Sequence, residues 1–101
     1  MNQATRLKVF VRSKWRCEVC GLPLHHHKAI KQIAHIIKAK YKKKYGEEVI
    51  DHPFNLKAVC CVSPCNNKVD LGVKVGLINE LLKRIYDDLG YAEEDRIYEK
   101  M

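Results

Sequence analysis

Two short cysteine stretches, Cys17-Glu-Val-Cys20 and Cys60-Cys61-Val-Ser-Pro-Cys65, decide how this chain can fold. Cysteines paired in two separated clusters are typical of a tetrahedral zinc site that takes two thiolates from each cluster. Free cysteines packed as small apolar side chains are the alternative interpretation. Structural zinc contributes ~10–16 kcal/mol of apparent binding energy to folding, which is as large as the ~5–15 kcal/mol stability of a typical domain. The stretches therefore predict a zinc-dependent fold.

The rest of the composition is that of an ordinary globular chain. The 101 residues are 47% apolar and 31% charged, which excludes a disordered or fibrous protein and predicts a single domain, residues 1–101. No apolar run is long enough to cross a membrane, so we expect no membrane partner. Residues 1–14 lack the apolar core of a signal peptide, so a cytoplasmic protein without disulfides is predicted.

The charge is distributed unevenly along the chain. The formal net charge is +7, but residues 1–45 carry +11 and residues 46–101 carry −4. A basic half of this kind favours a polyanionic partner, and nucleic acid is the usual one. A solvated lysine surface without any partner is the alternative.

Hydrophobic spacing and turn residues predict an α+β order of elements. A helix is predicted over residues 5–16, a hairpin or strand turning at Pro23 over 22–34, and a lysine-rich connecting loop over 36–51. A strand is expected over 56–61 and a helix start at Pro64. The apolar stripe of residues 77–89 predicts a helix that ends at Gly90. A short last helix is expected over 92–100.

Four motifs occur in a fixed order: Cys17-x-x-Cys20, Ile-Ala-His35-Ile-Ile, His52-Pro-Phe-Asn55-Leu and Cys65-Asn66-Asn-Lys68. Together they resemble the HNH endonucleases, whose ββα-metal fold places a β-hairpin and a helix around one divalent cation. The resemblance covers about residues 6–70, two thirds of the chain. It implies a small, zinc-stapled ββα-metal domain with flanking N- and C-terminal helices, the latter at about 77–100.

The resemblance also implies a role for individual residues. His35 matches the general base that activates water, and Asn55 matches the asparagine that ties its loop to the backbone and so orients the base. Asn66 matches a metal ligand on the helix, and Asp70, four residues later, would share its face. The structural zinc would be held by four matching cysteines: Cys17, Cys20, Cys60 and Cys65.

The chain departs from the family pattern at three places. Ala34 stands where many members have a metal ligand, and one of His25, His26 and His27 could replace it, although this triplet is more typical of a polar surface strand. The second cysteine pair is usually C-x-x-C; counting from Asn55 selects Cys60, with Cys61 as the alternative. The third departure is the long, lysine-rich gap between His35 and Asn55.

The residue types suit phosphodiester hydrolysis. Histidine titrates near neutral pH, as a general base requires. Oxygen ligands favour Mg²⁺ or Mn²⁺ as the catalytic cation. His52, a loop residue before proline, is interpreted as structural. Tyr41 and Tyr45 could contact sugars or bases, or could anchor their loop. The predicted DNA-binding residues are Lys38, Lys40, Lys42, Lys43, Lys44 and Lys68.

The sequence thus predicts a metal-dependent DNA endonuclease of low sequence specificity, because contacts to the phosphate backbone do not read bases. A monomer with one such site should nick one strand, although the sequence leaves a dimer open. A non-catalytic zinc-ribbon module that binds nucleic acid is the main alternative. A small basic component of a ribonucleoprotein is the other.

Overall fold

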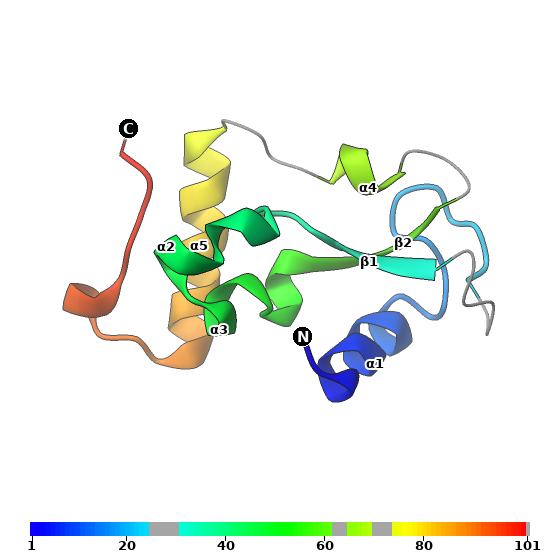
Figure 1. Ribbon diagram of the computed structural model, residues 1–101, viewed down its shortest axis with the longest axis horizontal. Coiled ribbons are helices and arrows are strands. Elements are labelled where there is room, and N and C mark those ends of the chain that lie inside the picture. Colours follow the sequence, from blue (N-terminus) through cyan, green and yellow to red (C-terminus); the bar gives the residue numbers. More distant parts are fainter. Residues whose placement is uncertain (25–30, 62–64, 70–73, 101) are drawn as a thin grey trace.

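The computed structural model describes residues 1–24, 31–61, 65–69 and 74–100, and the architecture is α+β (Figure 1). The longer elements are α1 (Gln3–Arg12), the strands β1 (Lys31–His35) and β2 (Leu56–Cys60), and α5 (Val75–Leu89). Three single-turn helices are α2 (Lys42–Tyr45), α3 (Glu47–Ile50) and α4 (Cys65–Lys68). The 3₁₀ turns are Ala39–Tyr41, Pro53–Asn55 and Glu93–Asp95.

The two strands form an antiparallel sheet in which His35 pairs with Leu56 and Lys31 pairs with Cys60. The predicted strand at 56–61 is confirmed within a residue. The expected turn at Pro23 is different: Pro23 makes only an isolated bridge with Arg16, and residues 25–30 lie outside the described residues. In Figure 1, α1 lies below the sheet and α4 above it, and α4 packs against both strands.

The first helix begins earlier and ends earlier than its predicted range. Asn2 caps it by accepting a hydrogen bond from Thr5 N at 2.8 Å. Lys14 and Trp15 then adopt left-handed backbone angles, with φ of 58° and 57°, which ends the helix. The Trp15 ring stacks on Phe10 at 5.3 Å between ring centroids. This turn carries the chain directly into the first cysteine pair.

The buried apolar side chains form two hydrophobic clusters. The first surrounds the cysteines and includes Val9 and Phe10 of α1 with Ala58 and Val59 of β2. The second packs α5 against the segment that follows β1, with these buried residues: Ile37, Tyr45, Val49, Ile50, Ile78, Leu81, Leu82, Ile85 and Tyr86. The predicted helix at 77–89 is confirmed, and Gly90 ends it with a φ of 75°.

Residues 36–51 are not the simple connecting loop that their lysines suggest. They form α2, α3 and a 3₁₀ turn, because Ile37, Tyr45, Val49 and Ile50 supply apolar side chains that α5 buries. The predicted last helix is also wrong beyond the single turn Glu93–Asp95. The remaining tail is extended and is held by Asn79, which bonds the backbone of Glu99 in both directions at 2.8 and 3.0 Å.

No helix within the described ranges is long and apolar enough to cross a bilayer.

Candidate metal centre and histidine site

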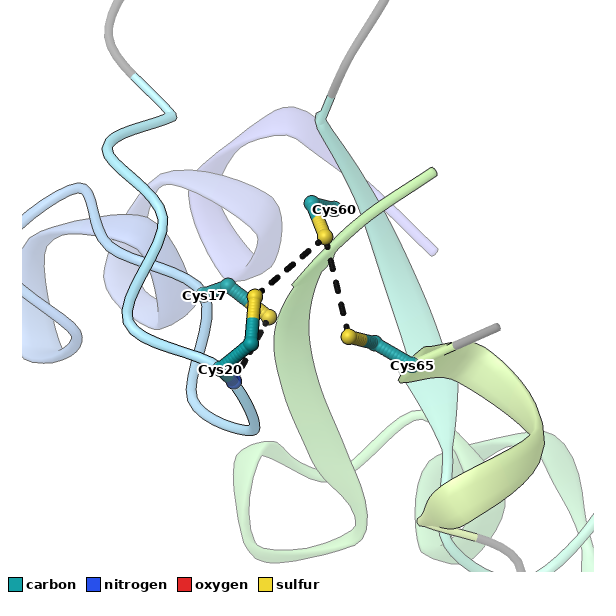
Figure 2. Close-up of side chains that lie close together, drawn as sticks. All are labelled: Cys17, Cys20, Cys60 and Cys65. Atoms are coloured by element: carbon teal, nitrogen blue, oxygen red, sulfur yellow. Dashed lines mark hydrogen bonds between the residues drawn. The ribbon is translucent and has the colours of Figure 1, made fainter. Parts of the chain in front are cut away.

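Four thiols converge at the end of the sheet that is remote from His35 (Figure 2). Cys17 and Cys20 come from the turn after α1, Cys60 is the last residue of β2, and Cys65 begins α4. Their sulfur atoms all lie within 4.8 Å of one another. The Cys20–Cys60 and Cys60–Cys65 sulfur pairs are each 3.6 Å apart. A tetrahedron with Zn–S bonds of ~2.3 Å has sulfur atoms ~3.8 Å apart, so the cluster fits a structural metal such as zinc.

The geometry distinguishes between Cys60, the last residue of β2, and Cys61, which follows the strand. Cys60 is buried and lies in the cluster, whereas Cys61 is exposed and does not belong to it. Cys60 is therefore the one of the two that lies beside Cys17 and Cys20. The two extra residues between Cys60 and Cys65, compared with C-x-x-C, are therefore compatible with a compact four-thiol centre.

Hydrogen bonds within the centre shift the thiol pKa values in opposite directions. Burial raises the pKa of Cys17, but backbone hydrogen bonds from Cys20, Val19 and Cys60 outweigh it and leave the pKa below its usual value. A backbone hydrogen bond at Leu22 lowers the pKa of Cys20, but the thiols of Cys60 and Cys17 raise it more, to about 11. Four thiolates at this spacing would repel one another, so the cluster suits a bound cation.

Glu18, which lies between Cys17 and Cys20 in the sequence, fixes this cysteine pair against β2. Its backbone N–H donates to the carbonyl of Ala58 at 2.8 Å, and its Oε2 accepts from Ala58 N at 2.7 Å. The same oxygen lies 3.1 Å from the guanidinium of Arg12, which also donates to the carbonyl oxygens of Pro53 and Leu56. The first cysteine pair is thus attached to the strand that supplies Cys60.

His35 lies at the end of β1 and pairs with a carboxylate that the sequence analysis did not identify. Its Nε2 is 2.8 Å from Oδ1 of Asp51, and the two side chains are 19% and 10% exposed. Oδ2 of Asp51 lies 3.1 Å from Nζ of Lys42 and 3.1 Å from the amino group of Met1. Asp51 directly follows α3. The sequence analysis took this segment for a loop, and for that reason it did not identify Asp51 as a partner of His35.

The surroundings of Asp51 keep it ionised. Burial raises the pKa of its carboxyl group, but hydrogen bonds and charge from His35, the terminal amine and Lys42 outweigh burial and leave the pKa below its usual value of 3.8. An ionised carboxylate only accepts hydrogen bonds, so Nε2 of His35 carries a proton and donates a hydrogen bond to Asp51. In the neutral ring, Nδ1 is then the nitrogen with the free lone pair.

Asn55 is fully buried and joins three segments of backbone. Its Oδ1 accepts from Ile37 N at 2.7 Å, and its Nδ2 donates to the carbonyl oxygens of Ile37 and Ile50 at 3.0 and 2.8 Å. Its own carbonyl accepts from Ile36 N at 2.8 Å. These bonds hold the residues after His35 against the residue before Asp51, and so fix the two partners relative to each other.

His52 has a structural place, as the sequence analysis interpreted it. The side chain is buried, its Nδ1 accepts from Phe54 N at 3.0 Å, and its Nε2 is 2.7 Å from Oδ2 of Asp88 on α5. Both ring nitrogens are engaged. His52 therefore caps the 3₁₀ turn Pro53–Asn55 and attaches it to α5.

The remaining predicted metal ligands are not placed. Asn66 belongs to α4, but its side chain lies outside the described residues, as do Asp70 and the triplet His25, His26 and His27.

Two of the predicted DNA-binding lysines lie beside acids: Lys42 pairs with Asp51, and Lys44 is 2.9 Å from Oε2 of Glu99. The exposed ones are Lys38, Lys40, Lys43, Lys44 and Lys68. Tyr45 is buried and donates its hydroxyl to Glu99, so it anchors the segment. Tyr41 is half-buried beneath the ammonium of Lys40, which is 5.2 Å from the ring centroid.

Comparison with known proteins gives no assignment: no family model, no curated protein and no solved structure matches this chain.

Proposed function

We propose that this chain is a metal-dependent DNA endonuclease of the HNH type, with His35 as the general base. The observation that carries the proposal is the hairpin of β1 and β2 with α4 against both strands and the His35–Asp51 pair at the end of β1. A hairpin followed by a helix is the arrangement that the motif order implies. The four-thiol centre would act as the zinc staple of this unit.

In this proposal His35 accepts a proton from water through Nδ1. Asp51 accepts the hydrogen bond from Nε2, which fixes the tautomer and the plane of the ring. A carboxylate in this position also stabilises the imidazolium that forms when the proton arrives. At 19% exposure the ring is in contact with solvent but cannot rotate freely. A base held in this way contributes about 10²- to 10⁴-fold to the rate.

Asn55 acts on His35 through the backbone rather than on substrate. It is fully buried, and its three side-chain hydrogen bonds connect the residues around Ile37 to those around Ile50. Loss of these bonds would leave buried polar groups unpaired and would separate His35 from Asp51. We therefore infer that Asn55 is a positioning residue.

The catalytic cation would be held by Asn66 and Asp70, whose oxygen donors suit Mg²⁺ or Mn²⁺. When bound, it supplies positive charge for the phosphate and the leaving oxygen. The exposed lysines Lys38, Lys40, Lys43 and Lys68 would contact the DNA backbone. Lys42 and Lys44 form ion pairs with Asp51 and Glu99.

Supercoiled plasmid incubated with the zinc-loaded protein tests the proposal. Open-circle product should accumulate when Mg²⁺ or Mn²⁺ is added and should be absent without either ion. Leaving the ion out is a better control than a chelator, which would also remove the structural metal. Binding of DNA without cleavage under every metal would support the zinc-ribbon binding module instead.

A further inference from the structure

A groove of about 420 Å³ lies where α1, the 3₁₀ turn Pro53–Asn55, β2 and α5 meet. Its cationic side chains are Arg12, Lys57 and Arg84, and its apolar side chains include Ile36, Phe54 and Leu81. None of these residues is one of the predicted DNA-binding lysines or belongs to the pair His35–Asp51. The groove is therefore a basic, partly apolar surface that the proposed reaction does not use.

The charge balance of the groove favours an anion. Its carboxylate, Glu18, is only 17% exposed and is occupied by Arg12 and by the backbone N–H of Ala58. Arg12 and Glu18 therefore largely neutralise each other. Lys57 and Arg84 form no ion pair within the described parts of the chain, so two positive charges face the groove without a counter-charge.

Two of the three acidic side chains of α5 are held by other partners, and the third, Glu80, forms no ion pair with Arg84 within the described parts of the chain. Asp88, one turn after Arg84, accepts from Nε2 of His52 at 2.7 Å. Asp87 is bound by the guanidinium of Arg96 at 2.7 Å. Both carboxylates are thus held by partners outside the groove, and Arg84 remains available to a ligand.

The aromatic ring of Phe54 gives the groove a second recognition element. Phe54 is 36% exposed, which is high for a large apolar side chain next to a core. The guanidinium of Arg84 lies 5.1 Å from its ring centroid, and the ring of His52 supports it from another side at 4.5 Å. The cation–π contact holds Arg84 at the groove, and the ring itself offers a surface on which a base can stack.

We propose that this groove binds a nucleotide of an unpaired DNA strand, with its phosphate on Arg84 and Lys57 and its base against Phe54. A volume of about 420 Å³ lies in the range of small-ligand sites, ~300–1,000 Å³, so it accommodates a nucleotide and not a duplex. A base reaches an aromatic side chain only when it is free of its own stack. The inference rests on the proposed function in taking DNA as the ligand, and it predicts a preference for substrates that contain a single-stranded segment.

Binding of a fluorescent single-stranded oligonucleotide, measured by anisotropy without added Mg²⁺ or Mn²⁺, tests this inference. R84Q and K57Q should each weaken binding and lower the slope of log affinity against log salt by about 0.7. Phe54→Leu should weaken binding about tenfold, as expected from loss of one stacked base. The matched control is K83Q, which removes the same charge from the neighbouring residue of α5, outside the groove.

The groove assignment is overturned if Lys83→Gln weakens binding as much as Arg84→Gln, if Phe54→Leu has no effect, or if a blunt duplex of the same sequence binds more tightly than the single strand. Melting temperature and zinc content of each variant show that the fold is retained. His35→Ala is titrated with the same oligonucleotide, and it should bind like wild type because His35 lies outside the groove. If the single strand binds through Arg84 but plasmid is never cleaved, the nuclease proposal is refuted and the groove proposal stands. If plasmid is cleaved and Arg84→Gln does not change that cleavage, the groove proposal is refuted and the nuclease proposal stands.

Discussion

Asp51 and His35 are brought together by elements that are distant in the sequence. The Oδ1 of Asp51 accepts from Nε2 of His35 at 2.8 Å, and Lys42 holds the other carboxylate oxygen at 3.1 Å. A second histidine–carboxylate pair, His52 with Asp88, has a similar separation of 2.7 Å, but Asp88 is 54% exposed and His52 has no free ring nitrogen. Of these two pairs, it is the first in which Nδ1 has no hydrogen-bond partner among the described residues.

Replacing Asp51 with asparagine should slow plasmid cleavage at least tenfold, within the ~10²–10⁴-fold that a positioned base contributes. An amide can donate as well as accept, so it no longer fixes the proton on Nε2. Asp88→Asn is the matched control, since it alters the other pair and should leave the rate unchanged. Asp51→Glu should recover part of the rate. If Asp51→Asn cleaves like wild type while keeping its zinc, Asp51 does not position the base.

The lowered pKa of Asp51 predicts a specific dependence of stability on pH. The pKa lies below 3.8 in the folded chain, so at acidic pH the unfolded chain binds the proton more readily. The stabilisation from this carboxylate should be fully present above about pH 4 and should be lost as the pH falls through the folded pKa. Melting temperatures of wild type and Asp51→Asn should therefore converge below pH 4. Curves that stay parallel throughout would contradict the assignment.

At the scale of elements, the four thiols join the first cysteine pair, the end of β2 and the start of α4. Cys65→Ser should abolish metal binding and unfold the chain, because the apparent binding energy of structural zinc, ~10–16 kcal/mol, is comparable with total stability. Cys61→Ser, a neighbouring and chemically identical change outside the cluster, should retain both the metal and the fold. Metal content by mass spectrometry and thermal unfolding measure the two outcomes. Equal stability of the two variants would show that the cluster does not bind a structural metal.

The segment that contains α2 predicts unequal contributions from its lysines. Lys40 and Lys43 are exposed, and neither forms an ion pair within the described ranges, whereas Lys44 forms an ion pair with Glu99. The double variant Lys40→Gln/Lys43→Gln should lower the salt slope of duplex binding by about 0.9 for each phosphate contact that is lost. Lys44→Gln, the control within the same segment, should change it less. Identical slopes for wild type and the double variant would mean that the segment is merely solvated.

Some elements of the structure could be predicted from the sequence, and others could not. The stripe at 77–89 and the strand at 56–61 were predictable because their apolar periodicity is local. The convergence of the cysteines was predictable because metal ligands must meet wherever the chain runs. The helices within residues 36–51 were not predictable, because single-turn helices have weak intrinsic stability. They form here because α5 buries Tyr45 and Ile50. Asp51 was missed for the same reason, as its meeting with His35 depends on that packing.

At the scale of the whole molecule, the proposed reaction has one centre per chain. The two strands of a duplex are antiparallel, so a single centre attacks one strand in each encounter. Supercoiled plasmid should therefore become open circle first, with linear DNA appearing late. A time course with linear product from the start, and no open-circle precursor, would indicate an active unit with two centres.

The account depends most directly on His35 as the general base. Its test is the initial rate of plasmid cleavage by wild type and His35→Ala, with added Mn²⁺ and with zinc content and melting temperature matched. The account predicts that His35→Ala binds DNA with wild-type affinity and retains the fold, but that its rate falls by about 10²- to 10⁴-fold. A His35→Ala rate within a few-fold of wild type would contradict it.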